Sequence, residues 1–253
     1  MDRYRSKGSI GLIVPPRCNE TVLEEAFRIR PAGLTWCVAS LGLPELTERD
    51  FDRALEATET AAHELALRKT NVIVQTGLPL QVARGPKYYL ELTSRLQAAV
   101  GPDIPVETDA GLVIEALRTL GARRISFISP YQKPIVDNSV RMLEAHGLEV
   151  VSAKGEELRL AELISELHFD SAYEKAMASF REQPGTDAFY LSCPQWPVVG
   201  SVERIERETG KPVVTQLTAI LWWALAAIGL PDRITGYGRL FDEPAPRVGR
   251  QLA

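Results

Sequence analysis

The sequence predicts an α/β protein with two similar halves, each built on a parallel β-sheet. Short apolar runs of strand composition alternate with helical segments along the whole chain, and this alternation is typical of parallel sheets covered by helices on both faces. The strand ends also repeat. Pro15 and Pro130 end two strands that lie 115 residues apart, and Gly77 and Cys193 follow two others that lie 116 residues apart. This repeat indicates two pseudo-symmetric domains with parallel sheets, and a site in the cleft between them.

Proline, glycine and capping residues set the element limits in the first half. Proline lacks the N–H of a strand ladder, so it ends an apolar run that would otherwise continue. Thr47 has the side chain of a helix N-cap and predicts a long helix that runs to about Lys69. Strands are expected at 9–14, 34–39, 71–75 and 104–106, helices at 21–30, 47–69 and 88–100, and loops at 41–44 and 76–79.

The second half repeats these signals. Gly121, Gly147 and Gly210 each follow a segment with helical periodicity, where glycine favours the left-handed conformation of a C-terminal cap. The last helix carries Trp222 and Trp223, of which one is expected in the core and the other at the surface. Strands are expected at 124–128, 148–153, 212–214 and in the run just before Cys193, and helices at 108–120, 134–146, 158–167, 171–182, 199–209 and 217–229.

The repeat also predicts the domain limits. The first domain is expected to comprise residues 1–107 and 215–253, and the second to comprise residues 108–214, including Cys193. A chain of 253 residues is long enough for two such domains.

Composition narrows the class of partner. The chain is 45% apolar and 25% charged, with a net charge of −4 and no basic stripe, so we expect no nucleic-acid partner. No apolar run approaches the roughly 18–20 residues that span a bilayer, and the charged N-terminus lacks the apolar core of a signal peptide. Three widely spaced cysteines suit a cytoplasmic location without disulfides. No His/Cys pair has the spacing of metal ligands, so no metal site is expected.

Cys193 is the candidate reacting group. An apolar run ends abruptly at this thiol, and Pro194 follows at once, so the backbone must turn there. A side chain at the carboxyl end of a buried strand faces the crevice in which open α/β sheets bind ligands. The alternative from these residues alone is that Cys193 is a small buried apolar residue.

Several short motifs, spread in order over nearly the whole chain, support a family resemblance. They are Leu12-Ile13-Val14-Pro15 with Asn19 nearby, Ser129-Pro130-Tyr131 followed by Asn138, Leu191-Ser192-Cys193, Gly210-Lys211-Pro212-Val213-Val214, Trp222 and Gly236-Tyr237-Gly238-Arg239-Leu240. With them the chain resembles the aspartate/glutamate racemase superfamily, in the branch of maleate cis–trans isomerase and arylmalonate decarboxylase. The resemblance implies two pseudo-symmetric Rossmann-like domains, a site between them, and no cofactor or metal.

The resemblance also bears on the reaction. Racemases and maleate isomerases of this superfamily place a cysteine at each of two strand ends, whereas this chain has Gly77 at the first position and Cys193 at the second. Arylmalonate decarboxylases share that arrangement. The expected function is therefore a cofactor-independent lyase acting on a small (di)carboxylate, in which Cys193 protonates an enediolate from one face. The hydroxyl residues that follow the glycine in decarboxylases are replaced here by Leu78 and Pro79.

The remaining candidate residues would bind the substrate. Arg17 has the geometry to clamp a carboxylate but is equally compatible with a solvated loop. Tyr131 and the backbone N–H groups near Gly77 and Cys193 are candidates for an oxyanion site, and Thr76 and Gln216 are further donors. The expected substrate-binding set is Pro15, Arg17, Asn19, Gln75, Gly77, Leu78, Tyr131, Pro194 and Gln195.

Other functions remain open at this point. Cys193 would serve an isomerase or racemase if an unconventional second group, such as Cys18, faced it across the substrate. It would serve a hydrolase as a nucleophile, although no base lies near it in sequence. A non-catalytic binder of small acids would keep the cleft without the chemistry. In each case the expected partner is a small-molecule carboxylate. Members of the superfamily are monomers, dimers or higher assemblies, so a homo-oligomer is one of the states open to this chain.

Overall fold

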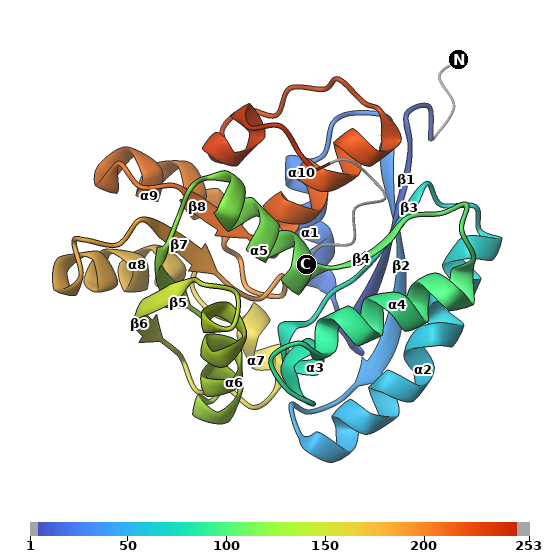
Figure 1. Cartoon of the computed structure of the whole chain (residues 1–253), viewed down its shortest axis with the longest axis horizontal. Coiled ribbons are helices and arrows are strands. Elements are labelled where there is room, and N and C mark those ends of the chain that lie inside the picture. The colour runs from blue at the N-terminus through green and yellow to red at the C-terminus, as the bar shows by residue number, and fades with distance from the viewer. Residues whose placement is uncertain (1–4, 247–253) are drawn as a thin grey trace.

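A computed structural model describes residues 5–246 and contains two four-stranded parallel sheets (Figure 1). The strand order is β2-β1-β3-β4 in the first sheet and β6-β5-β7-β8 in the second, so both sheets have the same order. This architecture confirms the predicted fold class. The strands are β1 (Gly8–Pro16), β2 (Leu34–Leu43), β3 (Val72–Gln75), β4 (Val106–Thr108), β5 (Arg124–Ile128), β6 (Glu149–Lys154), β7 (Ala188–Leu191) and β8 (Val213–Thr215).

Helices cover both faces of each sheet, because every connection between parallel strands must cross over the sheet. Helices α2 and α4 pack together against the first sheet, and α8 and α9 pack together against the second. No helix within residues 5–246 is both long enough and apolar enough to cross a membrane. The helices are α1 (Glu20–Ile29), α2 (Glu48–Leu67), α3 (Leu78–Val82), α4 (Tyr88–Val100), α5 (Asp109–Thr119), α6 (Lys133–Glu144), α7 (Ala161–Ser165), α8 (Ser171–Glu182), α9 (Val202–Thr209) and α10 (Gln216–Ile228), with the 3₁₀ helices η1 (Val199–Ser201) and η2 (Arg239–Asp242).

The central strands β3 and β7 are completely buried, which explains their unbroken apolar composition. In the first sheet, the chain passes from β1 outward to β2 on one side, and from β3 outward to β4 on the other side. In the second sheet, β5 to β6 and β7 to β8 run in the same way. The direction of the connections therefore reverses between the two central strands, β1 and β3 or β5 and β7. Open α/β sheets bind ligands outside the strand ends at such a switch point. The fold thus brings the ends of β1, β3, β5 and β7 into position for a site.

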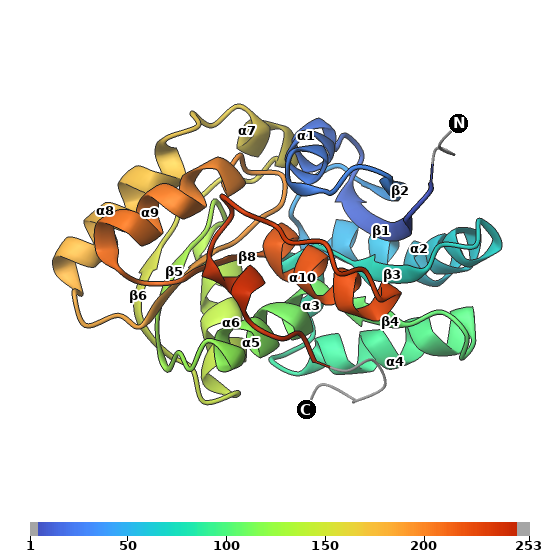
Figure 2. The same ribbon diagram turned by 90° about the horizontal axis from the view of Figure 1, so that it is seen from above.

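Helices α5 and α10 lie side by side between the two sheets (Figures 1 and 2). Each begins directly after the last strand of a sheet, α5 after β4 and α10 after β8. Helix α10 is apolar around most of its circumference, as expected for a helix buried on several sides. Trp222 and Trp223 are both buried in it, so the expectation that one of them lies at the surface is wrong.

Three further expectations differ from the structure. Strand β2 extends to Leu43, into the expected loop 41–44, because Leu43 pairs with Pro16 across an irregularity in the register. The expected loop 76–79 contains the start of the short helix α3, which follows Gly77. Of the expected helix 158–167, only Ala161–Ser165 is helical. Each of these segments borders the space between the sheets.

A buried carboxylate joins the two halves away from the strand ends. Glu25 of α1 is 1% exposed, and its Oε2 accepts the backbone N–H of Val199, in η1, at 2.7 Å. Burial raises the pKa of Glu25, although the Val199 N–H and the Arg28 guanidinium act in the opposite direction. The contact therefore gives the buried Val199 N–H of the second half an acceptor from the first half.

We expect Glu25→Ala to lower the free energy of unfolding by about 1–3 kcal/mol, because the Val199 N–H would stay buried without an acceptor. Glu25→Gln keeps an acceptor oxygen and should cost less. Urea unfolding of the wild type and both variants tests this. Equal losses for the two variants would mean that the hydrogen bond does not contribute.

Candidate active site

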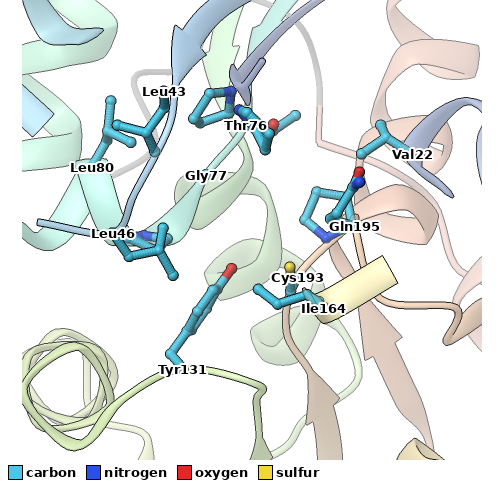
Figure 3. Close-up of a pocket in the computed structure, with 14 residues that line it drawn as sticks. Val22, Leu43, Leu46, Thr76, Gly77, Leu80, Tyr131, Ile164, Cys193 and Gln195 are labelled. Carbon is cyan, nitrogen blue, oxygen red and sulfur yellow. The ribbon is translucent and has the colours of Figure 1, made fainter. Parts of the chain in front are cut away.

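The ends of β1, β3, β5 and β7 surround a cavity with about 30 Å³ of free space (Figure 3). Both halves contribute to its wall. None of the described residues that line it is charged, and apolar side chains make up most of it. The lining residues are Pro15, Pro16, Val22, Leu43, Leu46, Thr76, Gly77, Pro79, Leu80, Tyr131, Ile164, Cys193, Pro194 and Gln195.

Cys193 occupies a strained turn at the end of β7. Its φ is +98°, in the left-handed region that side chains other than glycine rarely adopt. The Cys193 N–H donates to Gln216 Oε1 at 2.8 Å, and its carbonyl accepts the Trp196 N–H at 3.1 Å. Gln216 also donates to Ser192 Oγ at 3.0 Å. The first residue of α10 therefore fixes the turn that aims the thiol into the cavity.

Gly77 occupies the matching turn at the end of β3. Its φ is +104°, and its N–H donates to Asp109 Oδ2 at 3.0 Å. Asp109 is the first residue of α5, as Gln216 is of α10. A Cβ atom on Gly77 would lie only 2.3 Å from Pro15 Cγ. The cavity thus has a thiol on one strand end, and on the other a backbone with no room for a side chain.

The thiol of Cys193 is kept protonated. Burial raises its pKa to about 11, although hydrogen bonds from the Tyr131 hydroxyl and from the backbone N–H groups of Gln195 and Trp196 act in the opposite direction. Figure 3 shows the Tyr131 hydroxyl directed towards the sulfur. At neutral pH the group is therefore an acid with a proton to give, rather than a thiolate nucleophile.

Buried polar atoms without a hydrogen-bond partner gather at these strand ends. Within the described part of the chain, they include Thr76 Oγ1 and both amide atoms of Gln195, which line the cavity. Asp109 Oδ1 and Ser129 Oγ belong to the same set. Buried polar groups are nearly always paired, so a cluster of unpaired ones marks a place where a polar ligand would complete the bonding.

The structure brings together six of the residues expected at the site, Pro15, Gly77, Tyr131, Cys193, Pro194 and Gln195. The other four lie elsewhere. Arg17 is exposed, Asn19 is half-buried just before α1, and Leu78 is buried in the first turn of α3. Gln75 is buried with its amide bonded to the Thr76 carbonyl and to Gln81. Cys18, the expected second thiol, is exposed and does not line the cavity.

Sequence reasoning missed the apolar wall and the acid behind Gly77. Leu46 and Ile164 come from segments with weak periodicity that meet only in the folded chain, where the Leu46 N–H donates to the Arg159 carbonyl at 3.1 Å. Asp109 has the signature of an ordinary acidic residue at a helix start. The repeat offered a signal, because Thr108 and Thr215 end equivalent strands, and Asp109 and Gln216 begin the helices that follow.

Comparison with known proteins gives consistent matches over nearly the whole chain. A family model described as arylmalonate decarboxylase matches residues 10–241. The arylmalonate decarboxylase of Bordetella bronchiseptica is 28% identical over 240 residues, covering 94% of this chain and 98% of the relative. The maleate isomerase of Nocardia farcinica is 31% identical over 248 residues, covering 92% and 95%.

Solved structures show the same two kinds of enzyme. The maleate isomerase Iso from Pseudomonas putida S16 superimposes with a TM-score of 0.86 at 25% identity, covering 92% of this chain and 98% of that one. A liganded double mutant of arylmalonate decarboxylase also gives 0.86, at 26% identity, covering 93% and 99%.

We expect Gly77→Ala to destabilise the protein more than Gly85→Ala, by at least about 1 kcal/mol. Both glycines have positive φ, +104° and +119°, so both variants carry the backbone strain. Gly85 has open space around its Cβ position, whereas Gly77 meets Pro15. Urea unfolding compares the two free energies. A Gly77→Ala variant as stable as Gly85→Ala would show that Pro15 moves aside without cost.

Proposed function

This chain belongs to the arylmalonate decarboxylase family, and we propose that it is a cofactor-independent lyase that removes CO₂ from a malonate with an apolar substituent. Relatives of similar identity include a decarboxylase and isomerases, so the choice between these reactions rests on the site. The observation that carries the proposal is the asymmetry of the two strand ends. Cys193 offers a protonated thiol to one face of a ligand, and Gly77 offers no side chain to the other.

The reaction balances with the groups present. The bond between Cα and one carboxylate breaks, CO₂ leaves, and the electron pair stays on Cα, delocalised into the other carboxylate as an enediolate. The Cys193 thiol then gives its proton to Cα, and the resulting thiolate recovers a proton from solvent. No step uses a metal or cofactor. Because the proton arrives from one side only, a disubstituted malonate would yield one enantiomer of the product acid.

The apolar wall supports a substrate with one polar and one apolar end. Val22, Leu43, Leu46, Leu80 and Ile164 form the apolar part of the cavity lining. Figure 3 shows Leu43 and Leu80 on the side away from Cys193, and Ile164 beside it. Maleate carries a carboxylate at each end, and the cavity offers neither a cation for the second carboxylate nor a second thiol for isomerisation. An aryl or alkyl group fits this surface better.

The apolar group needs more room than the structure provides. The free space is about 30 Å³, whereas a cavity of about 150 Å³ holds benzene. Leu46 and Ile164, which belong to different halves, would have to separate for the substrate to enter. Among the described residues, their segments are linked by the Leu46–Arg159 backbone hydrogen bond and by a 3.9 Å contact between Arg159 and Glu45, and both contacts involve exposed or half-buried groups.

Thr76, Gln195 and Tyr131 are the proposed donors to the enediolate. Thr76 and Gln195 have unpaired polar atoms at the cavity wall, and the Tyr131 hydroxyl lies beside the thiol. Gln75 and Gln216 are unsuited to this role because their amides already bind within the protein. The Gly77 and Cys193 N–H groups are likewise committed, to Asp109 and Gln216.

Proton NMR in D₂O tests the reaction with methylphenylmalonate, phenylmalonate, maleate and a single-centre α-aryl acid. We expect the wild type to consume the malonates and to place one deuterium in one enantiomer of the methylphenyl product. Cys193→Ala should lose about 10²–10⁴-fold in rate, as removal of a general acid does, whereas Cys18→Ala should keep it.

Other outcomes of the same experiment point elsewhere. Conversion of maleate to fumarate would overturn the lyase proposal in favour of an isomerase. Solvent deuterium entering an α-aryl acid that racemises would favour a racemase. Saturable binding of the acids by the wild type without turnover would indicate a non-catalytic binder.

We expect Thr76→Val to lower kcat by roughly 10²–10³-fold with a smaller effect on KM, because the donor acts mainly on charge that develops after CO₂ leaves. Thr76→Ser keeps the hydroxyl and should retain most of the rate. Steady-state kinetics with the best malonate separates kcat from KM. A loss confined to KM would place Thr76 in ground-state binding alone.

A further inference from the structure

Asp109 is a carboxyl group with no exposure to solvent, placed directly behind the cavity wall. Its Oδ2 accepts the N–H of Gly77, which lines the cavity, at 3.0 Å. Its Oδ1 has no hydrogen-bond partner. The Gln81 side chain and the Ala110 N–H lie close enough to Asp109 to lower its pKa. The geometric hydrogen bonds of the Gln81 amide nevertheless go to Gln75 and to the Ala110 N–H. A carboxylate in this place is buried with half of its acceptor capacity unused.

In each half, the first side chain of a helix accepts the N–H of a strand-end residue, but the side chain is an amide in one half and a carboxyl group in the other. Gln216 and Asp109 each hold the N–H of a strand-end residue with positive φ. Gln216 is a neutral amide whose Oε1 accepts the Cys193 N–H and whose Nε2 donates to Ser192 Oγ. Geometry alone therefore does not require an ionisable group at residue 109, because an amide performs the equivalent task in the second half.

The groups that face Asp109 offer no positive charge. Cys193, Tyr131 and Tyr190 each have a pKa raised in part by the charge of Asp109, so all three lie within its electrostatic reach. Helices α3 and α10 and strand β8, which pack against α5, contain no charged residue, whereas α4 carries Glu91 and Arg95 and β4 carries Glu107. Arg95 is paired with Glu59 at 2.7 Å, and neither Arg95 nor Glu91 is among the groups that shift the pKa of Asp109. Glu107, two residues before Asp109, is coupled to Glu115 instead. An ionised Asp109 would thus stand uncompensated next to a cavity that has to hold a negative ligand.

We propose that Asp109 is a positioning residue that must be neutral for the cavity to hold an anion. As a carboxylic acid it still accepts the Gly77 N–H and so keeps the wall in place. As a carboxylate it adds a like charge beside the carboxylate or enediolate. The inference deepens the proposed lyase function and rests on it for the identity of the anion.

The protonation of Asp109 changes in the physiological range. Burial raises its pKa to about 7, against the lowering effects of hydrogen bonds with the Gly77 N–H, the Gln81 side chain and the Ala110 N–H. Asp109 is therefore neutral below this pH and charged above it, so anion binding should weaken as pH rises through about 7. Cys193, with a pKa of about 11, stays a thiol over this range and does not cause the change.

Phenylacetate, the product expected from phenylmalonate, is a suitable probe because its own charge is constant from about pH 6 to about pH 9. We expect its Kd for the wild type, measured by calorimetry, to rise about tenfold or more over this interval, since like charges in one site oppose each other. Asp109→Asn should bind with a nearly constant Kd. Glu107→Gln is the matched control and should behave as the wild type does, because Glu107 also has a raised pKa, of about 8.

The outcomes separate this proposal from the lyase function. A wild-type Kd independent of pH, or a dependence that Asp109→Asn retains or Glu107→Gln removes, overturns the role of Asp109. If the malonates are not decarboxylated but the Kd for phenylacetate rises with pH in a way that Asp109→Asn removes, the lyase proposal fails and the role of Asp109 stands. If Asp109→Asn does not fold, the wild type and Glu107→Gln still test the proposal, because the Kd for phenylacetate must rise near pH 7 in both.

Stability gives a second readout that needs no ligand. A carboxyl whose pKa rises on folding stabilises the folded state while it is protonated, and that stabilisation is lost as pH rises towards the folded value. We expect the urea midpoint of the wild type, relative to that of Asp109→Asn, to fall between about pH 5 and about pH 8. A constant difference would mean that Asp109 is already charged at the lower pH and would overturn the proposal.

Discussion

Two backbone turns with positive φ, at Gly77 and Cys193, are the constraint on which the site depends. Each is held by one hydrogen bond from its own N–H to the first side chain of a helix that begins after the next strand, Asp109 of α5 and Gln216 of α10. Those helices pack side by side between the sheets, so the burial of their apolar faces also fixes the two strand ends. The packing of α5 against α10 therefore also determines the direction in which the Cys193 thiol points.

The electrostatic character of the cavity follows from the same burial. Without a nearby cation, the thiol of Cys193 and the carboxyl of Asp109 both retain protons more firmly than they would in water. Under the proposed function, such a site would deliver a proton and hold a negative charge with neutral donors. Such preorganised donors are effective because water does not compete with them inside the protein.

The alternation of strands and helices and the repeat at 115 and 116 residues were sufficient to predict two parallel sheets and to single out Cys193. These are strong local signals, because buried central strands have unbroken apolar runs and proline ends them. The residues of the cavity wall were harder to predict from the sequence. Leu46 and Ile164 lie in segments without clear periodicity, and the long-range backbone contact at Leu46 brings them to the site. Asp109 was missed because nothing in its neighbourhood along the chain distinguishes a buried acid from an exposed helix-start residue.

The contact between Gly77 and Pro15 restricts the routes by which this chain could acquire a second thiol. A cysteine at residue 77 would place its Cβ within 2.3 Å of the Pro15 ring, so Pro15 would have to be replaced or displaced before the new side chain could be accommodated. The two changes are thus epistatic, and their order matters. Replacing Pro15 first would remove the clash before Gly77 changes, whereas changing Gly77 first carries the full steric penalty. The Pro15 ring thus keeps the end of β3 without a side chain, and Cys193 stays the one thiol among the described residues that line the cavity.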